Sequence, residues 1–67
     1  MYTADQKYRE AKREVGYRRM VYDKMVRAGN MLPEEARMRI ALMQEICEDY
    51  RRQAERDAPQ LKFPDSY

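Results

Sequence analysis

Apolar residues recur at spacings of three and four along two segments of the chain, which is the spacing of one face of an α-helix. In the first segment this face is interrupted once, at Arg18, and its apolar members are Tyr8, Ala11, Val15, Tyr22 and Met25. In the second segment the alternation is unbroken, and its members are Ala36, Ile40, Met43, Cys47, Tyr50 and Ala54. The two stripes predict two amphipathic helices, each with a narrow apolar seam that packs against a neighbouring helix.

Capping residues indicate where both helices begin and end. Thr3 and Gln6 have the spacing of a capping box, in which each side chain satisfies a backbone N–H group of the first turn. Gly29 can take the left-handed conformation that often ends a helix, and Pro33 suits the first turn of the next one. The expected elements are a helix at about 4–28, a turn at 29–32, a second helix at about 33–57 and, after Pro59, an extended tail at 59–67.

The two seams fit each other if the chain folds back at Asn30 and Met31. A short connection favours antiparallel neighbours, and in this register each large residue faces a smaller one, as interdigitated packing requires. The expected pairs are Met25 with Ala36, Tyr22 with Ile40, Val15 with Cys47, Ala11 with Tyr50, and Tyr8 with Ala54. The sequence therefore predicts an all-α, antiparallel two-helix hairpin over residues 1–58.

Pairs of opposite charge support the helices. Five of them are four residues apart with the acid first, the favourable order on a helix: Asp5–Arg9, Glu14–Arg18, Asp23–Arg27, Glu35–Arg39 and Glu48–Arg52. Gly16 departs from the pattern, since glycine inside a helix costs about 1 kcal/mol relative to alanine. It is either a tolerated defect or a place where another backbone approaches closely. Arg18, opposite Met43, either reaches out to solvent or fixes the register of the helices.

Four apolar residues lie beside the seams rather than within them. Tyr17 and Val21 fall on one flank of the first seam, and Leu42 and Ile46 fall on one flank of the second. With 3.6 residues per turn, an antiparallel hairpin places these flanks on the same side. We call this surface the flank patch. Exposed apolar patches usually mark interfaces, and a two-fold dimer that forms a four-helix bundle is the commonest arrangement.

The small size of the chain strengthens this expectation. A domain of 67 residues usually needs disulfides, a metal or a second subunit to be stable. The lone cysteine, Cys47, cannot form an intrachain disulfide, and the chain has no histidine, the usual zinc ligand. We therefore expect a homodimer. The alternative is that Leu61 and Phe63 of the tail fold back over the flank patch.

Basic residues gather in the first helix. The whole chain has a net charge of only +2, but residues 1–28 hold eight Lys or Arg against four Asp or Glu. Six of the eight point away from the seam and form what we call the basic stripe: Arg9, Lys12, Arg13, Arg19, Lys24 and Arg27. This stripe is either an ordinary solvated face or a surface that contacts phosphates or an acidic protein.

The residue patterns of common enzymes are missing. Without histidine, Cys47 lacks the usual base that activates a nucleophile, and its place in the seam indicates a buried structural thiol. Carboxylates gather at Glu45, Glu48 and Asp49, but bundle metal sites normally add a histidine three residues after a glutamate. We expect a non-enzymatic protein without cofactor or metal. No membrane span, export signal or cysteine pair is evident, so a cytoplasmic location is expected.

Three stretches of the chain carry a resemblance to a known group of proteins. They are Tyr17-Arg18-Arg19-Met20-Val21-Tyr22, then Val26 through Gly29-Asn30-Met31, then Glu35-Ala36 and Ile40-Ala41-Leu42-Met43 to Asp49-Tyr50. In this Arg-rich segment, Gly-x-Met turn and second helix, the chain resembles small uncharacterised helical-hairpin proteins encoded in early or accessory regions of bacteriophages and prophages of proteobacteria. It departs at Asp23, where a proline is frequent, and at Leu32, where a Ser or Thr cap is usual.

The resemblance implies a phage-encoded helical hairpin and supplies no catalytic residues. Small phage proteins of this size commonly bind and redirect a host protein. The leading hypothesis is therefore a dimeric hairpin that binds and modulates or inhibits a host or phage protein in the bacterial cytoplasm. The alternative is a nucleic-acid-binding accessory protein that uses the basic outer face of the first helix.

Overall fold

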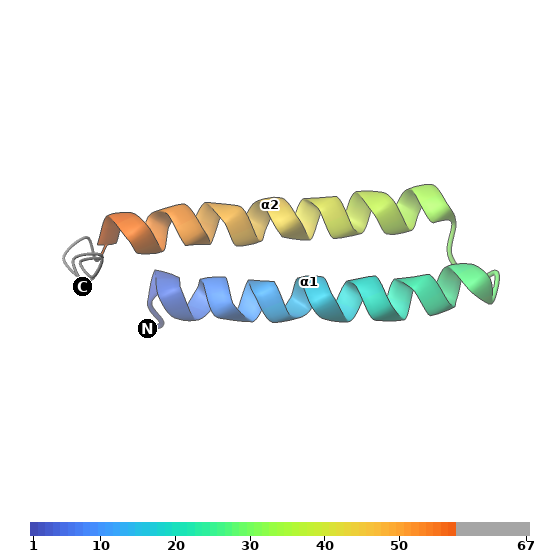
Figure 1. Ribbon diagram of the computed structural model, residues 1–67, viewed down its shortest axis with the longest axis horizontal. Coiled ribbons are helices and arrows are strands. Elements are labelled where there is room, and N and C mark those ends of the chain that lie inside the picture. The colour runs from blue at the N-terminus through green and yellow to red at the C-terminus, as the bar shows by residue number, and fades with distance from the viewer. Residues whose placement is uncertain (58–67) are drawn as a thin grey trace, which may run out of the picture.

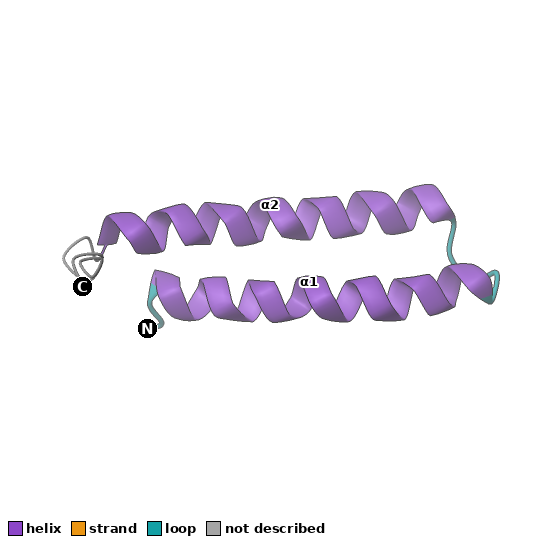
Figure 2. Cartoon of the chain, in the orientation of Figure 1, coloured by secondary structure: helices purple, strands orange, loops and turns teal. Residues whose placement is uncertain are grey.

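The computed structural model describes residues 1–57, which form two antiparallel helices joined by a short connection (Figures 1 and 2). Helix α1 comprises Ala4–Arg27 and helix α2 comprises Pro33–Asp57. The chain begins beside the end of α2, as Figure 1 shows. The all-α hairpin predicted from the seams is therefore confirmed. The predicted tail at 59–67, including Leu61 and Phe63, lies outside the described residues.

Helix α1 begins at the predicted capping box. The backbone N–H of Gln6 donates to Oγ1 of Thr3 at 3.1 Å, and the N–H of Thr3 donates to Oε1 of Gln6 at 2.8 Å. Each bond satisfies a donor that the helix itself leaves without a partner. All five predicted charge pairs also form, with N–O distances of 2.9 Å for Asp5–Arg9, 2.8 Å for Glu14–Arg18, 3.2 Å for Asp23–Arg27, 3.1 Å for Glu35–Arg39 and 3.8 Å for Glu48–Arg52.

The connection after α1 is a Schellman motif. The N–H of Gly29 donates to the carbonyl of Val26 at 3.0 Å, and the N–H of Asn30 donates to the carbonyl of Met25 at 2.8 Å. Gly29 has a φ of +80°, the left-handed conformation predicted for it. This cap wraps the chain around the last turn of α1 before α2 begins. Figure 1 accordingly shows α1 and the connection extending past the first residues of α2.

As a result, the register of the helices differs from the symmetric fold-back that the seams predict. The guanidinium of Arg18 donates to the carbonyl of Arg39 at 3.0 Å. Arg39 lies four residues before Met43, the residue predicted to face Arg18. The thiol of Cys47 lies 3.9 Å from the carbonyl of Tyr8 rather than opposite Val15. Four residues are about one helical turn. The predicted pairing is therefore wrong by at least one turn.

Only alanine side chains are buried within residues 1–57. Ala4, Ala11 and Ala36 are 5–7% exposed, and no large apolar side chain of this part is fully buried. The larger seam residues remain half-buried: Tyr8, Val15, Tyr22, Met25, Ile40, Met43, Cys47 and Tyr50. A single neighbouring helix covers a seam from one side only, so its flanks stay in water. Neither helix is both long and apolar enough, within the described residues, to cross a membrane.

Gly16 provides a test of this packing. Nothing lies within 4 Å of the position that a Cβ atom on Gly16 would occupy. Gly16→Ala should therefore raise the free energy of unfolding by about 1 kcal/mol, because alanine lowers the entropic cost of ordering the helix. Urea denaturation at a fixed protein concentration measures this change. Unchanged or lower stability would instead indicate that another backbone approaches Gly16 in the assembled protein.

Arg18 and Arg9 form a matched pair of arginines for a second test. Each donates from Nε to a carboxylate four residues earlier, but the Arg18 side chain is 24% exposed and that of Arg9 is 76% exposed. Only Arg18 also bonds to the other helix. Arg18→Ala should lower the free energy of unfolding by about 1–3 kcal/mol, whereas Arg9→Ala should cost less than about 1 kcal/mol. Equal losses in urea denaturation would contradict a register-fixing role for Arg18.

Candidate protein-binding face

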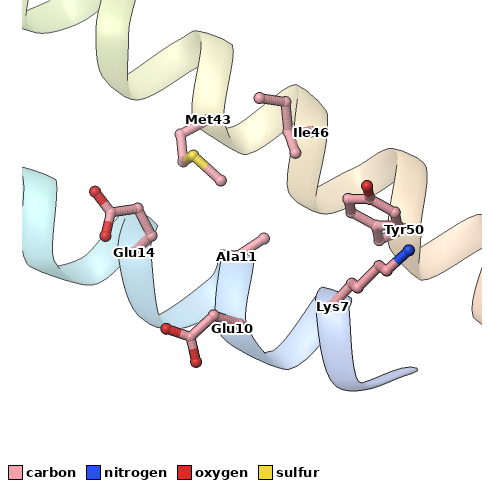
Figure 3. A pocket seen from close by; sticks show the side chains of 7 residues that line it. All are labelled: Lys7, Glu10, Ala11, Glu14, Met43, Ile46 and Tyr50. Carbon is pink, nitrogen blue, oxygen red and sulfur yellow. The ribbon is translucent and has the colours of Figure 1, made fainter. Parts of the chain in front are cut away.

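An open hollow of about 310 Å³ lies between the helices on the side that carries Ile46 (Figure 3). Four residues of α1 and three of α2 line it: Lys7, Glu10, Ala11, Glu14, Met43, Ile46 and Tyr50. We call this hollow the flank groove. It combines an apolar floor with charged groups along the α1 edge.

The groove exists because a small residue of α1 lies beneath larger residues of α2. Ala11 is 5% exposed and contributes only a methyl group. Figure 3 shows the side chains of Met43 and Ile46 on the α2 side of the space above this methyl group. Met43 is half-buried and Ile46 is 39% exposed. The space between them stays open, because no longer α1 side chain fills it from below.

The charged edge of the groove carries both signs. Glu14 accepts a hydrogen bond from Nε of Arg18 at 2.8 Å. The ammonium of Lys7 lies 5.6 Å from the centre of the Tyr50 ring, within cation–π range. Glu10 makes no salt bridge within residues 1–57. The edge therefore offers a carboxylate and an ammonium group to a neighbouring molecule.

The flank patch predicted from the sequence is only partly gathered in this groove. Tyr17, Leu42 and Ile46 are 55%, 53% and 39% exposed, and Val21 is half-buried. Of these four, Ile46 lines the flank groove. Tyr17 instead borders a smaller hollow of about 170 Å³ that is lined by α1 alone. The difference follows from the register, which moves Ile46 along α1 toward Ala11.

Sequence reasoning did not identify the charged residues of the groove. Lys7, Glu10 and Glu14 lie on the same flank of α1 as Tyr17, but their position beside Ile46 depends on the register. The usable signal was Ala11, the smallest residue of the first seam between Tyr8 and Val15. A small residue among larger ones predicts either a close approach of the helices or a hollow, and the sequence does not distinguish the two.

All six residues of the basic stripe are exposed. Two of them are neutralised in part, since Arg9 pairs with Asp5 and Arg27 pairs with Asp23. The ammonium of Lys12 lies 6.0 Å from the centre of the Tyr8 ring. The remaining stripe residues make no salt bridge within residues 1–57: Arg13, Arg19 and Lys24. The stripe is therefore weaker as a positive surface than its residue count indicates.

A charge network covers the outer surface near the end of α2. Arg51 bonds to Glu48 and to Glu55, the latter at 2.6 Å, and Arg52 bonds to Asp49 at 2.9 Å. The hydrogen bond from Arg51 holds the pKa of Glu48 below its ordinary value, and the same bond raises the pKa of Arg51. Such exposed pairs add little to stability. No three acidic, Cys or His residues in the described part of the chain are arranged to hold a metal.

Cys47 occupies the seam rather than an accessible site. Its thiol is free and half-buried, and it faces the carbonyl of Tyr8. The sequence contains no histidine that could act as its base. This environment fits a packed side chain rather than a nucleophile.

No protein-family model, curated protein or solved structure matches the chain. The predicted relation to phage-encoded hairpin proteins therefore stays a prediction.

Proposed function

We propose that the chain is a non-enzymatic protein-interaction module that acts as a homodimer and binds a host or phage protein. The observation that carries this proposal is the alanine-only burial within residues 1–57. Covering apolar surface stabilises a protein by roughly 25 cal/mol per Å². A surface that covers the half-buried seam and the exposed flank patch therefore stabilises the hairpin, and binding becomes coupled to folding.

In the proposed dimer, two hairpins pack through the flank patch into a four-helix bundle. Tyr17, Leu42 and Ile46 have the exposure that such an interface needs, and Val21 is half-buried beside them on the same flank. Small bundles of this kind commonly bury their apolar stripes between two identical hairpins. The proposed role of these four residues is thus to complete a core that one hairpin leaves open.

The basic stripe is the proposed contribution to the second partner. It lies on the outer side of α1, and apart from Arg13, which borders the same hollow as Tyr17, its residues lie away from the flank patch. Positive groups on an outer face speed the approach of an acidic protein surface. The resemblance to phage-encoded hairpins supports a bacterial target, which the protein modulates or inhibits in the bacterial cytoplasm.

A specific observation favours nucleic-acid binding as the second candidate function. Arg13, Arg19 and Lys24 are exposed and make no salt bridge within residues 1–57. Their charges are therefore available to phosphates. Binding to DNA or RNA that weakens steeply with added salt supports this candidate, whereas no binding at low salt eliminates it.

Leu42→Glu tests the flank patch. Leu42 is 53% exposed, so the substitution should preserve the hairpin, as far-UV circular dichroism can verify. We expect self-association, measured by light scattering over a concentration series, to weaken at least tenfold, because burying an unpaired carboxylate costs several kcal/mol. Met20→Glu is the matched control, since Met20 is 57% exposed and lies opposite the seam of α1. If Leu42→Glu changes neither oligomeric state nor partner binding, the patch assignment is wrong.

A further inference from the structure

We infer that the second copy of the chain seats on the flank groove, so that the centre of the homodimer lies over Ala11 and Ile46. This position is nearer the open end of the hairpin than Tyr17 and Val21 are. The inference rests on the proposed dimer and specifies which part of the face forms its centre. It follows from the shape, the size and the charge of this surface.

The shape of the face favours an interface centred on the groove. At the groove the apolar surface between the helices is hollowed over the methyl group of Ala11. Met43 and Tyr50 are half-buried there, and Ile46 is 39% exposed. An apolar side chain from an opposing surface can enter this space and bury the exposed parts of these three side chains. Shape-complementary filling of this kind characterises the centre of stable interfaces.

The size of the face favours a second hairpin over a single helix. Helix α1 has 24 residues, so it is about 36 Å long at a rise of about 1.5 Å per residue. Two packed helices together are about 20 Å wide. Such a face has an area of roughly 700 Å², close to the roughly 800 Å² that each partner contributes to a standard interface. A single helix covers about half of it, whereas a second copy matches both its length and its width.

The charges along the groove favour a second copy of the chain as the partner, because an edge that carries both signs can pair opposite charges between two identical copies. In a two-fold dimer, residue i of one copy meets residue j of the other, and j meets i. The groove edge carries both signs, with Lys7 near one end and Glu10 and Glu14 beside it. Lys7 of each copy can therefore face a carboxylate of the other. Glu10 is available for this role because it makes no salt bridge within residues 1–57.

The opposite flank of the hairpin is unsuited to self-association. Helical spacing places Lys12 and Arg19 of α1 and Arg37 of α2 on that side. All three are exposed, and none makes a salt bridge within the described residues. The carboxylates that helical spacing places on the same side of α2, Glu48 and Glu55, are already paired with Arg51. Two copies facing each other through this flank would therefore bring the three unpaired cations together, which opposes association. The flank groove is therefore the side on which a second copy fits.

The test compares Ile46→Glu with Val21→Glu by light scattering of the full chain over a concentration series. Ala41→Glu is the control, because Ala41 is exposed on the side of α2 away from the groove. We expect a wild-type dimer, at least about tenfold weaker association for Ile46→Glu, and a smaller effect for Val21→Glu. Ala41→Glu should associate like the wild type.

The outcomes separate this inference from the proposed function. If Val21→Glu weakens association as much as or more than Ile46→Glu, the groove is not the centre, although the dimer stands. If the wild type is monomeric throughout, or neither variant alters its association, the proposed dimer through this face fails as well.

A second measurement avoids substitutions that could disturb folding. On dilution of the wild-type protein, backbone amide NMR signals of Lys7, Glu10 and Glu14 should shift, while those of Lys12 and Arg19 stay constant. The reverse pattern would overturn the inference.

Discussion

Two helices that pack against each other can bury only the narrow line along which they touch. In this hairpin the residues on that line that leave water are alanines, Ala4, Ala11 and Ala36, whereas larger seam residues such as Tyr22 and Ile40 stay half-buried. The outer faces are occupied by ion pairs that add little to stability. The proposed function depends on this constraint, because the apolar surface that one hairpin leaves in water is the surface that another molecule can cover.

The register of the helices decides what that surface looks like. The Schellman motif at Gly29 reverses the chain direction just after the end of α1. The bond from Arg18 to the carbonyl of Arg39 fits the register that results. In this register Ile46 lies beside Ala11, about one turn of α1 before the level of Val15 at which the predicted pairing places it. A shift by one turn would replace Ala11 with a larger neighbour and close the groove. A turn at one end of the molecule thus shapes the proposed interface several turns away.

The hairpin itself could be predicted from the sequence because its signals are local. Helical periodicity, the Thr3 capping box and the left-handed Gly29 each depend on a few neighbouring residues, and the structure contains all of them. The register could not be predicted in the same way. Because each seam repeats every three to four residues, shifting one helix along the other by one turn again places apolar positions opposite apolar positions. Several registers are therefore equally compatible with the sequence.

The same limit applies to the candidate site. The exposure of Leu42 and Ile46 follows from their place beside the seam. The neighbours of Ile46 across the groove, Glu10 and Glu14, follow only from the register. The sequence therefore predicts which residues each helix exposes. It does not predict which residues of the two helices lie side by side, because that depends on the geometry of the turn that joins them.

Disulfide trapping tests the register most directly, since Cys47 is the only cysteine of the chain. Ala11→Cys and Val15→Cys each add one partner, and intrachain disulfides are counted by mass spectrometry after mild oxidation of dilute protein. Two cysteines bridge only when their Cα atoms lie within about 7 Å. We expect the cysteine at position 11 to form a disulfide with Cys47 readily and the one at position 15 not to do so. Efficient bridging from position 15, with none from position 11, would contradict the register and the groove that depends on it.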